Sequence, residues 1–290
     1  MGALSRREFL AGLTATASAA LAARSVSAAP ATPVGRVRKG SDLVTLGRSG
    51  VKVSLLGLGT GTRGGREHTG LGTPEFTRLL RHGLERGVRY IDTADAYSTH
   101  VFVRLALDGV KRDDYVLLTK TRAQHPEVAK ADIDRFLREL RVKHLDCLLM
   151  HCMRTGTFAT DMRPVMDVLL EAKQKGKVRA VGVSCHGWDP LVASVDCDWI
   201  DVHLARINPF SKAMDGTPED VSAELKKMHD KGRGVLGMKI FGENGLENRQ
   251  QRLESLKYVL GLGSVDAFTI GCTSPAQLDE TMTLIEEASA

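Results

Sequence analysis

The sequence is poor in aromatic residues and cysteine, and each shortage excludes a class of protein. Aromatic residues make up 5% of the 290 residues and are not interleaved with basic runs, which argues against a nucleic-acid surface. Five cysteines are too few, and odd in number, for a disulfide scaffold. Because 42% of the residues are apolar, a disordered chain is excluded, and we expect a substantial, mostly aliphatic core.

The excess of positive charge is small and unevenly placed. The chain has 40 Lys and Arg against 35 Asp and Glu, a net charge of +5. Residues 1–28 contribute +2, through Arg6, Arg7 and Arg24 against Glu8, and the rest of the chain carries +3. We therefore interpret the body of the protein as nearly neutral, with no nucleic-acid partner.

The N-terminal segment has the composition of a targeting signal. Arg6 and Arg7 precede an alanine-rich stretch that ends near Ala23, and small residues follow at Ala28 and Ala29. This apolar stretch is too short and too mild for a membrane span. The paired arginines resemble a twin-arginine (Tat) signal cleaved after Ala28 or Ala29, and a Sec signal or an uncleaved anchor is the alternative.

This interpretation implies export of the folded protein to the periplasm by the Tat machinery. No stable membrane span is expected after cleavage, and a membrane tether only if the signal is uncleaved. We expect a signal peptide over residues 1–28, a Pro- and Gly-containing linker over 29–41 and one domain over 42–290, which we expect to be monomeric.

Short aliphatic runs alternate with amphipathic segments from Leu43 onward. The segments between the runs have helical spacing; Pro74 opens the first of them and Gly87 closes it. Each run is apolar at nearly every position, as strands covered on both faces are. We predict eight strands, over Val53–Gly59, Val88–Ala94, Tyr115–Thr121, Leu145–Cys152, Val178–Cys185, Trp199–Ile207, Gly234–Gly242 and Asp266–Gly271.

Eight consecutive strand-helix units predict an α/β fold of the (β/α)₈ TIM-barrel class. The active site of such a barrel lies at the C-terminal ends of its strands. An open, doubly wound sheet is the alternative. The stretch Leu56–Gly61 superficially resembles the phosphate loop of that fold, but we expect no helix directly after it.

Polar residues close three neighbouring predicted strands. Asp92 closes the second strand, Lys120 the third and His151 the fourth, and Tyr97 lies on the loop after the second. Taken singly, Asp92 and Lys120 also fit a structural ion pair, and His151 a core histidine. A charged residue at the end of a buried strand is costly unless it is paired or used, so we expect these side chains to meet at one mouth.

The motifs around these residues resemble the aldo-keto reductase superfamily. The resemblance rests on Asp92-Thr93-Ala94-Asp95-Ala96-Tyr97, Leu118-Thr119-Lys120, Leu148-Leu149-Met150-His151 and Val181-Gly182-Val183-Ser184, in this order and spacing, and extends over residues 43–288. It implies a TIM barrel that transfers a hydride between a nicotinamide dinucleotide, NADP(H) or NAD(H), and an aldehyde or ketone, or the corresponding alcohol.

The four polar residues suit this chemistry. Carbonyl reduction needs a proton donor, and a free tyrosine, with a pKa of about 10, is a slow acid at neutral pH. A nearby ammonium favours the phenolate, so Tyr97 fits as general acid and base, Lys120 as its tuner and Asp92 as the partner of Lys120. His151 fits as a donor that orients the carbonyl oxygen. The resemblance implies the same four roles.

The resemblance also implies the cofactor contacts. It places Gly59 and Thr60 beneath the nicotinamide, Ser184 on the carboxamide and Asp92 close by. Independently, the helix start near Ser274-Pro275 is an anion site on physical grounds. The resemblance implies that the phosphates and adenosine meet the seventh strand and the last turn, at Met238, Lys239, Gly271, Gln277 and Glu280.

Several positions depart from the family pattern. Cys185 stands where the family has Asn beside the serine, and Leu204 or His203 where it has the carboxamide-binding Gln. Met238 replaces a stacking aromatic residue. Gly271 and Gln277 stand where basic residues often hold the 2′-phosphate, which leaves the choice between NADPH and NADH open.

Two other functions remain open. A non-catalytic nucleotide-binding or sensor protein on the same fold would explain the altered cofactor positions. A metal-dependent TIM-barrel hydrolase could use histidine and cysteine ligands, but their spacing matches no known ligand pattern, and we predict no metal. Those candidate ligands are His151, Cys152, Cys185, His186 and His203. We expect free cysteines and a substrate pocket built from the loops Arg63–Leu71 and Met153–Thr160.

Overall fold

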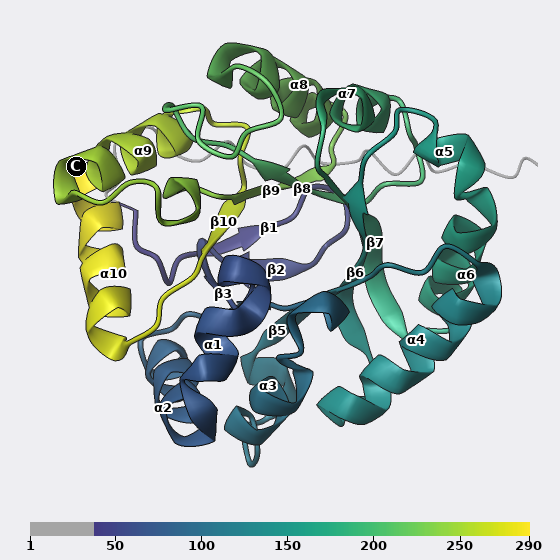
Figure 1. Ribbon diagram of the computed structural model, residues 1–290, viewed down its shortest axis with the longest axis horizontal. Helices are drawn as coiled ribbons and strands as arrows, with labels where there is room; N and C mark the ends of the chain where they lie inside the picture. The colour runs from purple at the N-terminus through teal and green to yellow at the C-terminus, as the bar shows by residue number, and fades with distance from the viewer. Residues whose placement is uncertain (1–37) are drawn as a thin grey trace, which may run out of the picture. The chain divides into compact units, whose positions relative to one another are not determined.

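A closed barrel of eight parallel strands forms the centre of the protein, as the computed structural model of residues 38–290 shows (Figure 1). The order around the barrel is β10-β3-β4-β5-β6-β7-β8-β9, so each strand except the first lies beside its predecessor, and β10 closes the ring on β3. The predicted (β/α)₈ TIM barrel is therefore confirmed. The predicted signal peptide lies outside the described residues.

Each of the eight predicted aliphatic runs corresponds to one barrel strand, and β6 extends one residue beyond its predicted run. The strands are β3 (Leu56–Gly59), β4 (Tyr90–Asp92), β5 (Val116–Thr121), β6 (Leu145–Met153), β7 (Val178–Cys185), β8 (Val202–Arg206), β9 (Gly234–Met238) and β10 (Ala267–Ile270). The α-helices around them are α1 (Arg66–Gly70), α2 (Gly72–Glu85), α3 (His100–Ala106), α4 (Pro126–Leu140), α5 (Phe158–Asp161), α6 (Arg163–Gln174), α7 (Trp188–Val195), α8 (Pro218–Asp230), α9 (Arg249–Gly261) and α10 (Pro275–Ser289).

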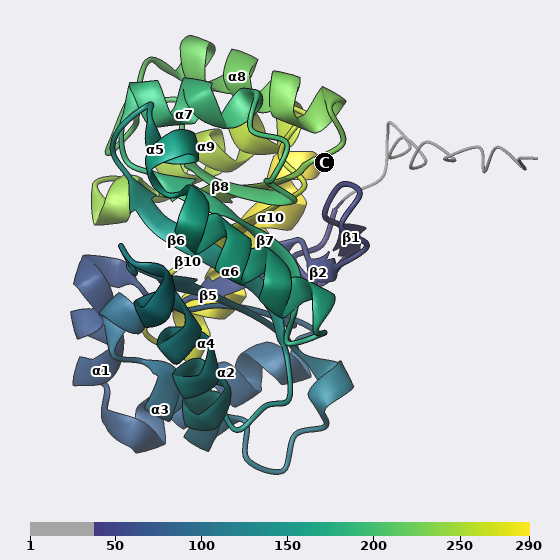
Figure 2. The same ribbon diagram turned by 90° about the vertical axis from the view of Figure 1, so that its right-hand side faces the viewer.

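An antiparallel hairpin precedes the barrel and splits the first predicted run. Its strands are β1 (Leu43–Thr45) and β2 (Lys52–Ser54), so the prediction of one strand over Val53–Gly59 was wrong at its start. Ser54 ends the hairpin because its hydroxyl donates to the Leu56 carbonyl and accepts from the amide of Tyr90, which leads into β4. The hairpin lies at one end of the barrel (Figure 2).

The stretch between β3 and α2 is helical rather than a loop. A 3₁₀ turn, Thr62–Gly65, is followed by the one-turn helix α1, so the expectations of no helix after Gly61 and of a loop over Arg63–Leu71 were wrong. Gly64 and Gly65 have φ of 69° and 89°, a conformation that glycine adopts without strain. The glycines let the chain reverse within one turn, which a helical-periodicity argument does not detect.

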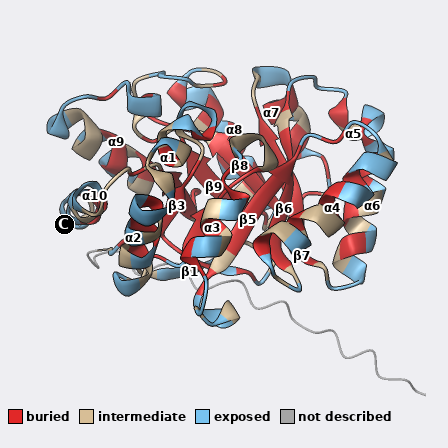
Figure 3. Ribbon diagram, turned by 60° about the horizontal axis from the view of Figure 1, so that its bottom comes forward, coloured by how far each residue is buried: buried red, intermediate tan, exposed pale blue. Residues whose placement is uncertain are grey.

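The core has two layers. The inner layer fills the barrel with side chains such as Leu118, Leu149, Leu204 and Leu236, and Leu46 of the hairpin joins it. The outer layer lies between the strands and the helices, whose apolar faces point inward while their outer faces are exposed (Figure 3). The barrel interior is therefore packed, and polar chemistry is confined to the strand ends.

Three smaller observations complete the fold. The residues at the end of the expected linker bind the barrel, since the Arg38 amide donates to Ser289 Oγ at 2.8 Å and the Leu56 amide to the Gly40 carbonyl at 2.9 Å. Among residues 38–290, no helix combines the length and apolarity that a membrane crossing requires. All five cysteines are free, as predicted, and only Cys152 is not fully buried.

Candidate active site

A cavity of about 210 Å³ opens at the C-terminal ends of the barrel strands. Three of the four predicted catalytic residues, Asp92, Tyr97 and His151, line it, and Lys120 lies buried behind Tyr97. The structure thus brings the four residues together from β4, the loop after β4, β5 and β6. The remaining lining residues are Gly59, Gly61, Thr62, Gly64, Arg122, Cys152, His186, Met238, Lys239, Ile240, Phe241, Glu243, Asn244, Thr269, Ile270 and Gly271.

Lys120 and Asp92 form a buried ion pair. Their side chains are 1% and 7% exposed, and Lys120 Nζ also donates to the Thr93 carbonyl at 2.9 Å. The parallel pairing of β4 with β5 places Asp92 opposite Leu118, so the longer Lys120 side chain reaches back to it. Lys120 Nζ lies 4.9 Å from the centre of the Tyr97 ring, which puts one ammonium between a carboxylate and a phenol.

Burial and charge act in opposite directions on these groups. Burial lowers the pKa of Lys120, but the contacts with Asp92 and Tyr97 outweigh it, so its pKa is raised and the ammonium is retained. Burial raises the pKa of Asp92, and Lys120 opposes the rise. For Tyr97, burial raises the pKa more than Lys120 lowers it. The expectation that Lys120 favours the phenolate thus holds for the direction of its effect but not for the net pKa. Tyr97 therefore keeps its phenolic proton at neutral pH.

His151 stands edge-on to Tyr97 in the same cavity. The two ring centres are 5.5 Å apart and the rings are inclined at 88°. Burial above all, and then the cations Lys120 and Arg122, lower the pKa of His151 to about 2. The imidazole is therefore neutral over the physiological range and carries one N–H. Its Nδ1 atom is buried and has no hydrogen-bond partner in the described part of the chain.

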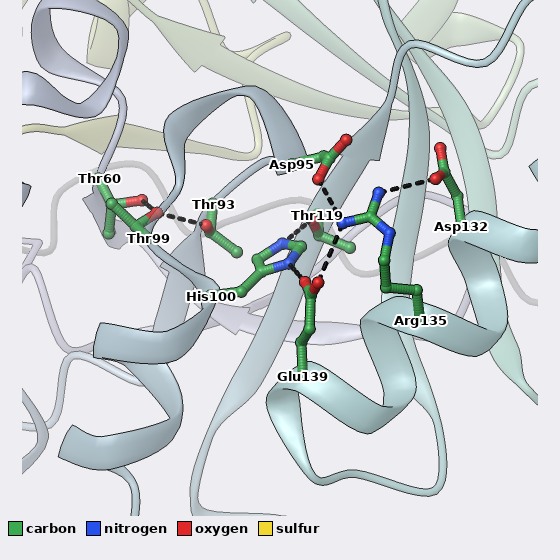
Figure 4. A network of polar contacts seen from close by, with 9 residues as sticks. All are labelled: Thr60, Thr93, Asp95, Thr99, His100, Thr119, Asp132, Arg135 and Glu139. Carbon is green, nitrogen blue, oxygen red and sulfur yellow. Dashed lines mark hydrogen bonds and ion pairs between the residues drawn. The ribbon is translucent and has the colours of Figure 1, made fainter.

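The turn that carries Tyr97 is held by polar contacts at both ends (Figure 4). Tyr97 ends a 3₁₀ turn, Asp95–Tyr97, and Ser98 follows with φ of 57°. Before the tyrosine, Asp95 Oδ1 accepts from Arg135 Nη1 at 2.7 Å. After it, the Thr99 hydroxyl lies 2.9 Å from that of Thr60 and 2.7 Å from that of Thr93. The main chain on either side of Tyr97 is thus fixed.

One face of α4 ties this turn to the strand of Lys120. Arg135 also donates to Asp132 at 2.7 Å and to Glu139 at 3.0 Å. Glu139 accepts from His100 Nδ1 at 2.8 Å, and the other ring nitrogen of His100 meets the Thr119 hydroxyl at 2.8 Å. We refer to Asp132, Arg135 and Glu139 as the α4 clamp.

The α4 clamp reaches both sides of Lys120, because Asp132 also accepts from the Thr121 hydroxyl at 2.6 Å while Thr119 is bound through His100. In the described residues, Asp95, His100 and Glu139 are the single group with metal-ligand spacing. The guanidinium of Arg135 already forms an ion pair with each carboxylate of that group, so the group does not indicate a metal.

Glycines that follow β3 pack against Tyr97, a role that sequence reasoning missed. A Cβ on Gly61 would lie 2.5 Å from the Tyr97 ring, and one on Gly65 would lie 2.2 Å from the Tyr97 carbonyl. Both glycines therefore allow the tyrosine to lie close to the strand end. The run Gly57, Gly59, Gly61, Gly64 and Gly65 is the signal that could have shown it.

The predicted cofactor residues divide into two groups. Gly59, Met238, Lys239 and Gly271 line the cavity together with Asp92. Side chains larger than hydrogen do not fit at the glycines, since a Cβ on Gly59 would lie 2.7 Å from Thr269 Oγ1 and one on Gly271 would lie 2.0 Å from Thr62 Oγ1. The main chain of these glycines forms the floor of the cavity. Lys239, paired with Glu243 at 2.6 Å, lies at the edge of this floor.

The other predicted cofactor residues do not line the cavity. Thr60 is fully buried, and its hydroxyl donates to the Asp92 carbonyl at 3.0 Å. Ser184 is 1% exposed, and its hydroxyl accepts from the Cys152 amide at 3.0 Å. Gln277 and Glu280 are exposed on α10, where Gln277 caps Thr273 and Glu280 lies 4.0 Å from Arg252. Both residues lie in the first two turns of α10, whose start at Pro275 agrees with the helix start expected near Ser274-Pro275.

The candidate ligands of a metal-dependent hydrolase do not converge. His151, Cys152 and His186 line the cavity, but Cys185 is buried against Ser194 at 3.3 Å. His203 is fully buried on β8 with neither ring nitrogen bonded. None of these five residues belongs to a metal-ligating group within residues 38–290.

The substrate side of the cavity differs from the expected loops. Of the predicted stretches Arg63–Leu71 and Met153–Thr160, only Gly64 reaches the lining. Arg122 and His186, directly after β5 and β7, take that place. Sequence reasoning missed Arg122 as a site residue and named His186 only as a candidate metal ligand. Arg122 follows Lys120 by two positions, and a cation so close to a strand end was the available signal.

Comparisons with known proteins agree with this fold. The Aldo/keto reductase family model matches residues 55–259. Methylglyoxal reductase DkgB of Salmonella typhi is 28% identical over 138 residues, 45% of this chain and 51% of that protein. An NADH-specific methylglyoxal reductase of Escherichia coli is 23% identical over 197 residues, 59% of this chain and 60% of that protein. The match thus spans about half the length of such curated relatives.

The solved structures show the same fold. A Pseudomonas aeruginosa protein described as an aldo-keto reductase superimposes with a TM-score of 0.73 at 20% sequence identity. The superposition covers 88% of this chain and 99% of that one. The likeness extends over the barrel with its helices, and it concerns the fold alone.

Proposed function

The chain belongs to the aldo/keto reductase family, and from this we propose that it transfers a hydride between a nicotinamide dinucleotide and an aldehyde or ketone, or the corresponding alcohol. The observation that carries the proposal is the convergence of Tyr97, Lys120, Asp92 and His151 at one cavity. A phenol backed by an ammonium and flanked by a neutral imidazole is an arrangement that delivers one proton to a developing alkoxide.

Each residue has a separate task in reduction. A nicotinamide dinucleotide held beside Gly59, Met238 and Lys239 would supply the hydride for the reduction. His151, neutral because of its lowered pKa, donates a hydrogen bond that orients the carbonyl oxygen. Tyr97 gives its phenolic proton to that oxygen, and the Lys120 ammonium stabilises the phenolate that remains. Asp92 keeps Lys120 charged and in place. In the oxidation of an alcohol the same proton returns to Tyr97.

The cavity fits the dinucleotide in its floor and its charge. Gly59 and Gly271 present main chain rather than side chains to the cavity at the ends of β3 and β10, and the buried Thr269 hydroxyl lies beside Gly59. Lys239 offers a cation for the phosphates. Both NADP(H) and NAD(H) remain candidates; one relative is named as NADH-specific, and the basic residues that often hold a 2′-phosphate are Gly271 and Gln277 here.

Replacement of Tyr97 by Phe tests the proposal. We expect kcat for aldehyde reduction to fall by about 10²–10⁴, the usual contribution of a positioned general acid. Nucleotide affinity, measured by fluorescence titration, should remain. Tyr115→Phe is the matched control, because Tyr115 precedes the same strand as Lys120 at its far end. An unchanged kcat in Tyr97→Phe would overturn the assigned role.

A non-catalytic nucleotide sensor is the second candidate. The Ser184 hydroxyl accepts a hydrogen bond from the main-chain amide of Cys152. Leu204 is one of the two residues that stand where the family has its carboxamide-binding Gln, and it is buried inside the barrel. Single-turnover reduction of an aldehyde by the nucleotide-loaded protein separates the two. Reduction at a measurable rate excludes the sensor, and binding without reduction excludes the enzyme.

We also propose that the protein is exported in its folded state by the Tat machinery and acts in the periplasm as a monomer. The support is the Arg6-Arg7 pair ahead of an alanine-rich stretch. Substitution of both arginines by lysine should leave the protein in the cytoplasm with its N-terminus uncleaved. Export of the double variant at the normal level would refute the Tat route.

A further inference from the structure

Arg122 is the unpaired charge of the active-site cavity. The other charged groups there are matched: Asp92 pairs with the underlying Lys120, and Lys239 pairs with Glu243. Arg122 is exposed, lines the cavity, and forms no ion pair in the described part of the chain. With both pairs formed, the net charge of the cavity is that of one guanidinium.

The position of Arg122 separates it from the dinucleotide. It follows β5, whereas Lys239 follows β9, and in the closed order of strands β5 lies diametrically opposite β9. The glycine floor belongs to the ends of β3 and β10, next to β9. Arg122 therefore stands on the side where Tyr97 and His151 meet the carbonyl compound, between the strands that present them.

The charges around His151 and His186 indicate that the mouth of the cavity is positively charged. The charged groups that act on His151 are Lys120, Arg122 and His186, and each lowers its pKa. Burial above all, and then Arg206, Lys239 and Arg154, lower the pKa of His186 to about 4, with Glu243 as the one opposing charge. Arg154, just past β6, is exposed and likewise has no ion pair among residues 38–290. One unpaired guanidinium thus follows β5, and another follows β6, the strand that carries His151.

We propose that the substrate of this site is a small carbonyl compound that carries a carboxylate, which Arg122 binds while His151 and Tyr97 hold the carbonyl oxygen. The inference rests on the proposed reductase function and adds the substrate class to it. A guanidinium presents two parallel N–H groups that match the two oxygens of a carboxylate in one plane.

The kinetic test compares two four-carbon aldehydes that differ in one terminal group, succinic semialdehyde and butanal. We expect the wild-type protein to have the higher kcat/KM for the acid. In Arg122→Gln the ratio of the two kcat/KM values should fall roughly tenfold or more, the loss of one charge-assisted pair. An equal ratio in both proteins would overturn the proposal, as would a wild-type preference for glyceraldehyde 3-phosphate over succinic semialdehyde.

Arg138→Gln is the matched control. Arg138 is exposed in the last turn of α4, at the opposite end of the helix from Arg122, and its side chain has no ion pair in the described residues. The substitution removes the same charge from the protein but not from the mouth. The ratio should therefore stay at the wild-type value, and a fall equal to that in Arg122→Gln would mean that net charge alone is responsible.

A binding experiment decides the inference even if no turnover is found. Butanoate and butanamide are titrated calorimetrically into the wild-type protein and into Arg122→Gln, with and without NAD⁺ or NADP⁺. Tighter binding of butanoate to the wild type, lost in the variant, supports the carboxylate site. Equal binding of the two ligands overturns it. Failure to reduce either succinic semialdehyde or butanal with either nucleotide refutes the proposed function, and the titration then still judges the charge of the site.

Discussion

The two sides of the active-site mouth are built differently. On the side of β4, β5 and β6, the polar side chains are bound to one another and to the α4 clamp, so Tyr97 and Lys120 are fixed from several directions. On the side of β7 to β10, Ser184 is turned to the main chain, and the lining consists of His186, Met238, Lys239, Ile240, Phe241, Glu243, Asn244, Thr269, Ile270 and Gly271. The first side is organised for proton transfer and the second for accommodation of a ligand.

This difference implies that substitutions on the two sides should affect different quantities. Changes near Tyr97 should lower kcat, because the geometry of proton transfer depends on a rigid surround. Changes on the β7–β10 side should alter nucleotide affinity or stability and leave the chemical step intact. The following predictions test that separation, beginning with the largest effect.

Lys120→Met should damage both activity and stability. It leaves the Asp92 carboxylate buried without its partner, which costs about 3–5 kcal/mol in comparable buried pairs. The double variant Lys120→Met, Asp92→Asn should recover most of the free energy of unfolding in a urea titration. Its kcat should stay low, since the ammonium near Tyr97 is still absent. Recovery of kcat together with stability would contradict a catalytic role for Lys120.

The buried His203, on the β7–β10 side, should make stability depend on pH without touching catalysis. Burial and then Arg233 lower its pKa to about 3, so the folded protein keeps it neutral while the unfolded chain binds a proton below about pH 6.5. Stability is thus highest above that pH and falls toward pH 3, by about 1.4 kcal/mol per unit.

His203→Leu should remove this contribution. Urea titrations at pH 6 and pH 4 would show a shallower loss of stability than in the wild type, and kcat at pH 7 should be retained. An identical pH dependence in the two proteins would mean that the folded state can protonate His203, contrary to its complete burial.

Arg135→Met should show whether the α4 clamp positions Tyr97. The substitution frees Asp95, two residues before the tyrosine, and leaves Glu139 with His100 alone. We expect kcat to fall roughly tenfold, because small displacements of a reacting group are costly. The dissociation constant of the nucleotide should not change. Arg138→Met, on the same helix, serves as the control, and equal losses in both would indicate a general effect on α4.

Ser184→Ala should have the smallest effect. The amide of Cys152, whose φ is 61°, would lose its acceptor, at a cost of about 1–3 kcal/mol in stability. Nucleotide affinity should stay within about twofold, because the hydroxyl is already engaged. A loss of affinity of tenfold or more would instead place the hydroxyl in contact with the nucleotide.

The fold could be predicted from the sequence because each barrel strand is a short aliphatic run between helical segments. Strand starts were less certain, since Val53 and Leu56 belong to one apolar run although Ser54 ends a hairpin between them. The helix α1 was missed because its glycines break the periodicity on which helix prediction depends.

The candidate site was predicted in part for a similar reason. Asp92, Lys120 and His151 interrupt apolar strands, and the interruption is visible in the chain. Arg135 and Glu139 look like the solvent face of an amphipathic helix, and only the packed structure shows that they bind Asp95 and His100. The net pKa of Tyr97 also depends on burial, which no local pattern records.

The pairing of β10 with β3 has a consequence for the synthesis of the protein. Leu56 lies beside Phe268, so the barrel closes through a contact between the two ends of the domain. Such non-local pairing forms slowly, and until β10 has left the ribosome β3 keeps an open edge that can join other chains. The incomplete barrel therefore needs protection from aggregation until β10 has been synthesised. The barrel can close only after the last strand, β10, has been synthesised and pairs with β3.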